Sequence, residues 1–220
     1  MNLQNQTQTK FDLEACFRFF TEAGVLSCAT VSSDGVPQIR SIEEYDVEAG
    51  VFYFLTAKGS SLARHLGNSA VVAFSALDKE TRTMVRLRGY ATQLDEETQL
   101  LWKVRFYALK PQLRELYPYK TWQVGRVYAV ENGLFEVLRR SGRKVERQYF
   151  PLGRGFRRSE GFSITDICAG CGACRAVCPA DCIGIGKPMI LHEENCLHCG
   201  ACADACPRGA IVRFGENRLP

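Results

Sequence analysis

The sequence predicts two domains: a mainly β domain, an antiparallel barrel with flanking helices, and then a small α+β domain built around cysteines. Two observations lead to this prediction. The first 150 residues hold short β-rich segments and hairpin turns, without the strand–helix alternation that builds parallel sheets. Nine of the 11 cysteines then fall between residues 168 and 206, and this uneven placement marks a domain boundary.

The composition is that of an ordinary folded chain. Its 220 residues are 46% hydrophobic and 24% charged, enough for one medium and one small domain. Residues 1–10 are polar and lack the apolar stretch of a signal peptide, and no apolar run is long enough to cross a bilayer. We therefore expect a cytoplasmic protein without a membrane partner. Thiols stay reduced there, so clustered cysteines bind metal more often than they form disulfides.

The expected elements of the first domain follow from hydrophobic spacing. A helix is expected over 12–23, because Leu13, Cys16, Phe17 and Phe20 recur at helical intervals. Apolar and β-branched segments predict strands over 25–31, 37–45, 51–56, 71–77, 84–92 and 124–137.

Turn and cap signals separate these strands. Ser33-Asp34-Gly35 predicts a hairpin turn, and Glu131-Asn132-Gly133 predicts an interruption of the last strand. Two further helices are expected, one over 60–66 with a serine cap and Gly67 at its end, and an amphipathic one over 95–109.

Two copies of the pattern C-x-x-C-x-x-C-x-x-x-C-P start 28 residues apart, at residues 168 and 196. In such repeats three nearby cysteines bind one 4Fe–4S cluster, and the fourth, beyond a short helical turn, reaches the other cluster. We assign one cluster to Cys168, Cys171, Cys174 and Cys206. We assign the second cluster to Cys196, Cys199, Cys202 and Cys178.

The repeats resemble bacterial-type two-cluster ferredoxins over residues 160–215 and match every ligand position. The alternative is a pair of zinc knuckles, but zinc gains nothing from a cysteine–proline in each repeat. Cys182 falls where this pattern usually has a small residue. We expect it to be a buried residue beside a cluster; the alternative is a spare or redox-active thiol.

Four segments of the first domain, three predicted strands and then a predicted helix, follow one another in the sequence: 24–31, 35–42, 51–56 and 60–66. Over residues 11–94 this order resembles the FMN-binding split barrel of the pyridoxamine 5′-phosphate oxidase family. The resemblance implies an antiparallel split β-barrel with flanking helices, followed here by the two-cluster ferredoxin-like domain. It also implies FMN as cofactor and a homodimer, because in that family the flavin lies between two subunits.

The resemblance implies flavin contacts at matching positions of this chain. The strand Arg40-Ser41-Ile42 matches the strand whose arginine and backbone meet the flavin. The strand end Leu55-Thr56 matches the one whose hydroxyl approaches the phosphate, and Ser60-Ser61 the start of the phosphate-facing helix. A helix N-terminus is also an anion site on physical grounds alone.

The phosphate site departs from the oxidase pattern in its charges. The two positions after Ser60 are basic in the oxidase, whereas this chain has Ser61 and Leu62. We expect Lys58 and Arg64, on either side of the helix start, to replace those charges. The alternative is that both are solvated surface charges. This departure also gives no reason to expect pyridoxamine phosphate as the substrate.

We expect the barrel over 1–150, a basic linker over 151–162 and the ferredoxin-like domain over 163–220. The basic residues near the boundary include Arg139, Arg140, Arg154, Arg157 and Arg158. No nucleic-acid motif accompanies them, so a solvated linker, or one that docks acidic surface, is favoured over nucleic-acid binding.

The predicted function is a flavin- and iron–sulfur-dependent oxidoreductase that passes electrons between two 4Fe–4S clusters and FMN. Its redox partner would be a protein or a small-molecule donor or acceptor, and no catalytic residue is assigned. One alternative is an electron carrier without its own substrate; another is a barrel that binds deazaflavin or haem. His65, His192 and His198 are expected to have surface or packing roles, and none is a persuasive haem ligand.

Overall fold

The computed structural model describes residues 11–118, 120–154 and 160–215. The chain divides into two compact units. The first comprises Met1–Ala76, Val85–Phe135 and Phe150–Phe156, and the second comprises Leu77–Met84, Glu136–Tyr149 and Arg157–Pro220. The polar start of the chain and the linker residues Arg157 and Arg158 lie outside the described residues. No helix in the described ranges is long and apolar enough to cross a membrane.

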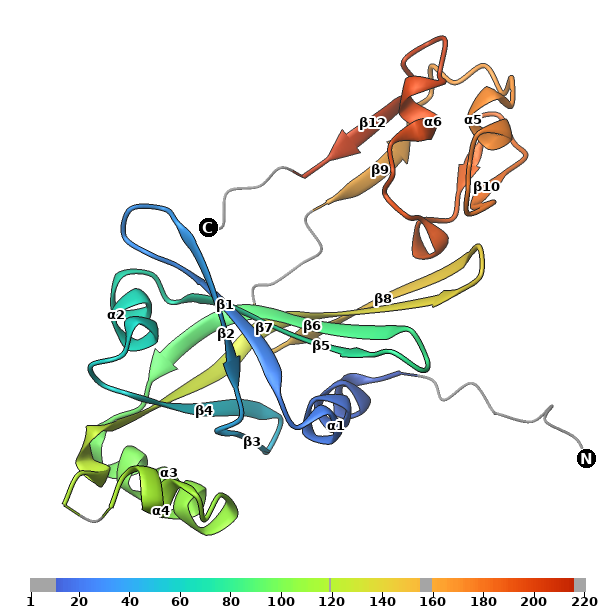
Figure 1. Cartoon of the computed structure of the whole chain (residues 1–220). Helices are drawn as coiled ribbons and strands as arrows, with labels where there is room; N and C mark the ends of the chain where they lie inside the picture. Colours follow the sequence, from blue (N-terminus) through green and yellow to red (C-terminus); the bar gives the residue numbers. More distant parts are fainter. Residues whose placement is uncertain (1–10, 119, 155–159, 216–220) are drawn as a thin grey trace, which may run out of the picture. The chain divides into compact units, whose positions relative to one another are not determined.

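An eight-stranded curled antiparallel sheet forms the barrel (Figure 1). Seven strands follow the order β2–β1–β5–β6–β7–β4–β3, and β8 pairs with β7. The strands are β1 (Leu26–Val31), β2 (Pro37–Ile42), β3 (Tyr45–Glu48), β4 (Val51–Ala57), β5 (Val71–Asp78), β6 (Thr83–Gln93), β7 (Gly125–Ser141) and β8 (Lys144–Leu152). Buried and exposed residues alternate along β5 and β6, as expected for strands with one face on a core.

Helix α1 (Leu13–Ala23) packs its apolar face on an aromatic core. Its N-cap is Asp12, whose side chain accepts a hydrogen bond from the backbone N–H of Ala15 at 2.7 Å. Phe20 is fully buried, and its ring lies 6.0 Å from that of Phe52 and 5.5 Å from that of Phe135. The helix expected over 12–23 is therefore confirmed.

The single strand expected over 37–45 is wrong, because the chain forms two strands there. β2 ends at Ile42, and β3 begins at Tyr45 and pairs with β4 at the opposite end of the strand order. The Tyr45 ring is buried and stacks on Phe52 at 5.5 Å. To bury this ring, the chain leaves the β1–β2 hairpin after Ile42 and starts a new strand. The alternation of apolar and polar residues in the sequence does not show where one strand ends and the next begins.

The interruption expected near residue 132 is also wrong, because β7 is continuous through it. Instead, β6 and β7 approach each other closely at two glycines. A Cβ atom on Gly133 would lie 2.5 Å from the carbonyl oxygen of Arg88, and one on Gly89 would lie 2.6 Å from that of Asn132. Gly133 thus permits a close strand approach rather than ending the strand.

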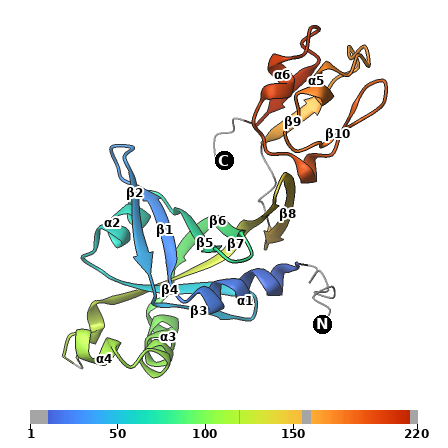
Figure 2. The same cartoon turned by 45° about the vertical axis from the view of Figure 1, so that its right-hand side comes forward.

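Helix α2 (Ser61–Asn68) packs against β1 and β4, with Ser60 as its N-cap. It continues through Gly67 to Asn68, so it ends two residues after the expected last residue, Leu66. Helix α3 (Glu96–Leu109) packs against α4 (Leu113–Leu116), as Figure 2 shows. The amphipathic pattern expected for α3 does not describe it well, because Leu101 is 68% exposed whereas Gln99 is buried. Gln99 donates to the Leu94 carbonyl and accepts from the Val127 N–H, which satisfies its buried amide.

The second unit contains the cysteine repeats. Its outer strands β9 (Gly161–Ile164) and β12 (Ile211–Phe214) pair antiparallel, as do β10 (Ile183–Gly184) and β11 (Ile190–Leu191). The helical turns α5 (Ala173–Ala176) and α6 (Ala201–Asp204) occupy equivalent places in the two repeats. Because β8 ends at Leu152 and β9 begins at Gly161, both described ends of the expected linker belong to strands.

The second unit also includes the tip of the β7–β8 hairpin, residues 136–149. The Arg143 Nε donates to the Pro179 carbonyl at 3.1 Å, and the Asn195 side chain donates to the Val145 carbonyl at 2.8 Å. The basic residues 139–144 therefore lie in a hairpin, and Arg143 among them contacts the first cysteine repeat, whereas the sequence suggested part of a connection between domains.

Candidate functional site

Two separate hollows in the second unit are lined by cysteines. The first hollow is lined by Cys168, Cys171 and Cys174 of the first repeat and by Cys206 of the second. Ile164, Met189 and Ile211 supply apolar walls. The structure thus brings together the four cysteines that the spacing assigns to one cluster, including the one from the distant repeat.

The second hollow has the complementary arrangement. Cys196, Cys199 and Cys202 come from the second repeat, and Cys178 comes from the first. The equivalent residues Cys171 and Cys199 are exposed, whereas Cys174 and Cys202 are buried. All the described cysteines are free thiols, so the arrangement leaves them available as metal ligands.

Backbone N–H groups point at several cysteine sulfurs. Cys168 Sγ accepts from the N–H of Gly170 at 3.4 Å and of Met189 at 3.5 Å. In the second repeat, Cys196 Sγ accepts from the His198 N–H, and Cys206 Sγ from the Ala210 N–H, each at 3.3 Å. The hydrogen bond from Ala210 also lowers the pKa of Cys206. Thiolates that accept N–H groups within an apolar wall fit the donor set of an iron–sulfur cluster.

Cys182 also lines the second hollow. It is 3% exposed, and its sulfur lies 3.4 Å from that of Cys178. Hydrogen bonding with Cys196, together with burial, raises the pKa of Cys182, and the same hydrogen bond lowers the pKa of Cys196. This direction keeps the proton on Cys182 and favours the thiolate on Cys196. The expected burial beside a cluster site is confirmed.

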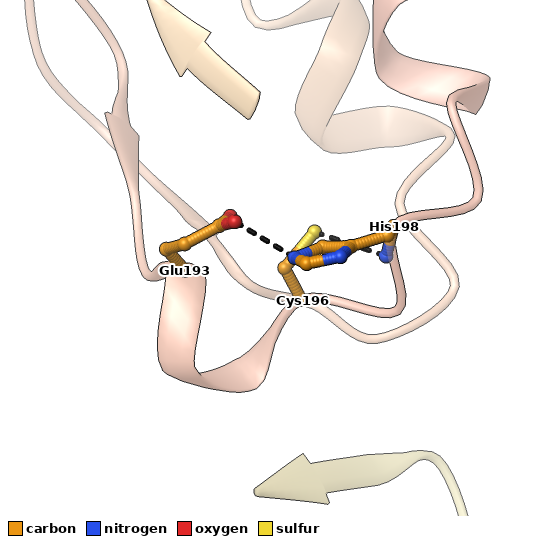
Figure 3. Close-up of side chains that lie close together, drawn as sticks. All are labelled: Glu193, Cys196 and His198. Atoms are coloured by element: carbon orange, nitrogen blue, oxygen red, sulfur yellow. Dashed lines mark hydrogen bonds and ion pairs between the residues drawn. The ribbon is translucent and has the colours of Figure 1, made fainter. Parts of the chain in front are cut away.

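Glu193 and His198 lie next to Cys196 (Figure 3). Their potential ligand atoms and the Cys196 sulfur all fall within 4.8 Å of one another. The His198 Nε2, however, is 2.7 Å from the Glu193 carboxylate, so the two side chains are hydrogen-bonded to each other. His198 therefore has a packing and hydrogen-bonding role beside the second hollow, as expected for this histidine.

In the barrel, the expected phosphate-side residues meet at the start of α2. Ser60 Oγ accepts the N–H of Ala63 at 3.0 Å and lies 3.0 Å from Thr56 Oγ1. Lys58 and Arg64 are both exposed, one on each side of the helix start. The geometry of the first turn leaves the N–H groups of Ser61 and Leu62 without a helical acceptor. Anion-binding groups are thus gathered here, although Ser60 already serves as the cap.

The other expected flavin contacts lie on β2 and β4. Arg40 is half-buried and pairs with Cys28 of β1, Ser41 is exposed and Ile42 is buried. Leu55 is 5% exposed and belongs to the cluster around Trp102 and Phe106, so its side chain is a core residue, and its backbone N–H already donates to the Glu44 carbonyl at 2.8 Å.

Sequence reasoning missed Thr30 and the two hydrogen bonds by which it connects Arg40 to His65. Thr30 Oγ1 accepts from the Arg40 Nη1 at 3.0 Å and lies 2.9 Å from the Nδ1 of His65 on α2. The sequence did contain one indication of Thr30: it follows Leu26 and Cys28 at alternate positions of β1, so its hydroxyl falls on the buried face of that strand. His65 has a buried, hydrogen-bonded position, within the packing role expected for it.

Comparison with known proteins supports both parts of the chain. The family described as "4Fe-4S dicluster domain" matches residues 167–210. The chain is 31% identical over 80 residues to the pyridoxine/pyridoxamine 5′-phosphate oxidase of Paracoccus denitrificans, and 31% identical over 74 residues to that of Roseobacter denitrificans. Each match covers 34% of this chain, and the two matches cover 36% and 37% of the respective oxidases. The chain therefore matches only about a third of the length of these oxidases.

Solved structures share the barrel fold. A NimC/NimA family protein from Clostridium acetobutylicum superposes with a TM-score of 0.53 at 20% identity, covering 64% of this chain and 92% of the other. A haem-binding protein from Mycobacterium smegmatis gives 0.51 at 12% identity, covering 64% and 59%. At these identities the likeness is one of fold. The chain thus joins a split barrel similar to the pyridoxamine 5′-phosphate oxidases to a 4Fe–4S dicluster domain.

Proposed function

We propose that this chain is an electron-transfer oxidoreductase that passes electrons between two 4Fe–4S clusters and an FMN on the barrel, coupled to the oxidation or reduction of a small molecule. The observation that carries the proposal is the pair of hollows, each lined by four repeat cysteines, in a chain that also contains the split barrel. The first cluster is assigned to Cys168, Cys171, Cys174 and Cys206. The second is assigned to Cys178, Cys196, Cys199 and Cys202.

The barrel residues have complementary roles in this proposal. The start of α2, with Thr56, Ser60 and Ser61, receives the phosphate, and Lys58 and Arg64 supply positive charge beside it. Arg40 on β2 serves the ring side. In a homodimer, the second subunit would complete the flavin site.

The two cofactor types suit each other chemically. Iron–sulfur clusters exchange single electrons, and a bound flavin can collect two of them and deliver them as a pair. Joining both sites in one chain raises the effective concentration of each at the other. The protein groups around the sulfurs, mainly backbone N–H donors and apolar side chains, are the means by which the chain sets the cluster potentials.

The proposal is tested by cofactor analysis of the full chain purified without oxygen. We expect about eight iron and eight sulfide per chain, from two four-iron clusters, together with FMN identified by the absorption spectrum and mass of the released cofactor. Stoichiometric zinc without sulfide, or a released haem or deazaflavin, contradicts it. Rapid reoxidation of the reduced chain by small acceptors supports an enzyme, whereas slow reoxidation by all of them supports an electron carrier.

A further inference from the structure

A hydrogen-bonded chain of three side chains, two of them buried, links β2, β1 and α2. It runs from Arg40 through Thr30 to His65, with distances of 3.0 Å and 2.9 Å. Thr30 and His65 are 3% and 5% exposed, and both belong to the small set of buried polar residues. Burying a polar group costs free energy of folding unless the group is hydrogen-bonded. The network therefore favours the one arrangement in which these side chains are hydrogen-bonded to each other.

The donors and acceptors of the network can be assigned from chemistry. A guanidinium group has only donors, so the Thr30 oxygen accepts from Arg40. Among the residues that the structure describes, the Thr30 hydroxyl has one remaining hydrogen-bond partner, the Nδ1 of His65. Donation to Nδ1 therefore leaves no buried hydroxyl proton unpaired. His65 is then a neutral imidazole with its proton on Nε2.

Arg40 has the properties of a residue held ready for a ligand. It is half-buried, and it has no carboxylate partner within the described ranges. One of its terminal nitrogens is anchored on Thr30, while the planar guanidinium retains further N–H donors. A side chain that is ordered before binding loses less conformational entropy when the ligand arrives.

We propose that Thr30 and His65 are positioning residues that hold Arg40 toward the flavin. This inference rests on the proposed flavin function of the barrel. Helix α2 then contributes twice to the same site, because its N-terminus faces the phosphate and His65, one turn later, fixes the arginine on the ring side. A shift of α2 therefore disturbs both ends of the cofactor together.

The test measures FMN and riboflavin affinity of the full chain by quenching of flavin fluorescence. Thr30→Val has nearly the same shape but lacks the hydroxyl, and we expect it to weaken both ligands by about three- to tenfold. Thr30→Ser keeps the hydroxyl and should restore binding. His65→Leu should match Thr30→Val, whereas His65→Asn, which retains an acceptor near the Nδ1 position, should bind more tightly than His65→Leu.

A double-mutant cycle separates positioning from general damage. If Thr30 acts through Arg40, Thr30→Val should cause no further loss in an Arg40→Ala background. Additive losses, or wild-type affinity in Thr30→Val, would overturn the inference even when the wild type binds FMN and Arg40→Ala weakens it. Absence of flavin binding by the wild type would instead contradict the proposed function.

Nitrogen NMR of imidazole-labelled full chain provides a readout that does not depend on any variant. It should show an unprotonated Nδ1 and a protonated Nε2 for His65. A proton on Nδ1 would overturn the hydrogen-bond assignment.

Discussion

The sulfur of Cys182 lies 3.4 Å from the sulfur of Cys178, and both line the second cysteine hollow. Five cysteines therefore surround a site for which the repeat spacing assigns four ligands. The hydrogen bond that raises the pKa of Cys182 and lowers that of Cys196 favours Cys182 as the protonated neighbour.

The first prediction follows from this relationship. Cys182→Ala should leave about eight iron per chain, because each four-iron cluster keeps its four assigned thiolates. Iron and sulfide analysis of anaerobically purified protein measures this, with Cys182→Ser as a variant that keeps a small polar side chain. Loss of about half the iron would show that Cys182, rather than Cys178, is the fourth ligand.

A second prediction compares equivalent positions in the two repeats. Cys171 and Cys199 are both exposed, and each is assigned to a different cluster. Cys171→Ser should damage the first cluster before the second, and Cys199→Ser the second before the first. Electron paramagnetic resonance of the reduced variants should show two different remaining spectra. The same remaining spectrum in both variants would contradict the assignment.

The third prediction concerns the phosphate end of the flavin site. Lys58→Ala and Arg64→Ala should each weaken FMN by about tenfold, because hydrogen bonds to charged groups contribute roughly 1.5–3 kcal/mol. Riboflavin lacks the phosphate, so its affinity should barely change. Lys79→Ala, at an exposed turn, is the control for a lost positive charge. Unchanged FMN binding in both variants would contradict the prediction and leave the phosphate to backbone N–H groups and hydroxyls.

A fourth prediction tests the close approach of β6 and β7. Gly133→Ala places a Cβ atom 2.5 Å from the Arg88 carbonyl oxygen, so the strands must separate. We expect a destabilisation of about 1–3 kcal/mol, as for other overpacked sites. Gly67→Ala in α2 meets no atom within 4 Å and should instead stabilise by about 0.5–1 kcal/mol. Thermal unfolding followed by tryptophan fluorescence reports on the barrel, because Trp102 and Trp122 both lie in the first unit.

The fifth prediction concerns the end of the barrel. Leu152 is 3% exposed, and the Arg154 N–H donates to the Asn132 side chain at 2.8 Å. A chain ending at residue 154 should therefore fold, form a dimer and bind FMN, whereas one ending at residue 150 should have a lower melting temperature. Analytical ultracentrifugation and flavin titration of both chains decide this. A monomer without flavin affinity at 154 residues would contradict both the flavin site and the homodimer.

The sequence by itself determined the features that depend on local spacing. The cysteine repeats predict which sulfurs share a site, because tight turns bring three ligands together and the fourth follows a short helix. The helices capped by Asp12, Ser60 and Asp95 are likewise local, since each cap binds an N–H three residues further on.

Only the tertiary structure decided features that depend on contacts between distant segments. The break between Ile42 and Tyr45 follows from burial of the Tyr45 ring on Phe52, across the β3–β4 pair. The apolar residues on the outside of α3 and the close approach at Gly133 likewise depend on which neighbours the fold supplies. The link between Arg40 and His65 passes through Thr30 on a third element, and no local pattern contains a hydrogen bond between residues 35 positions apart.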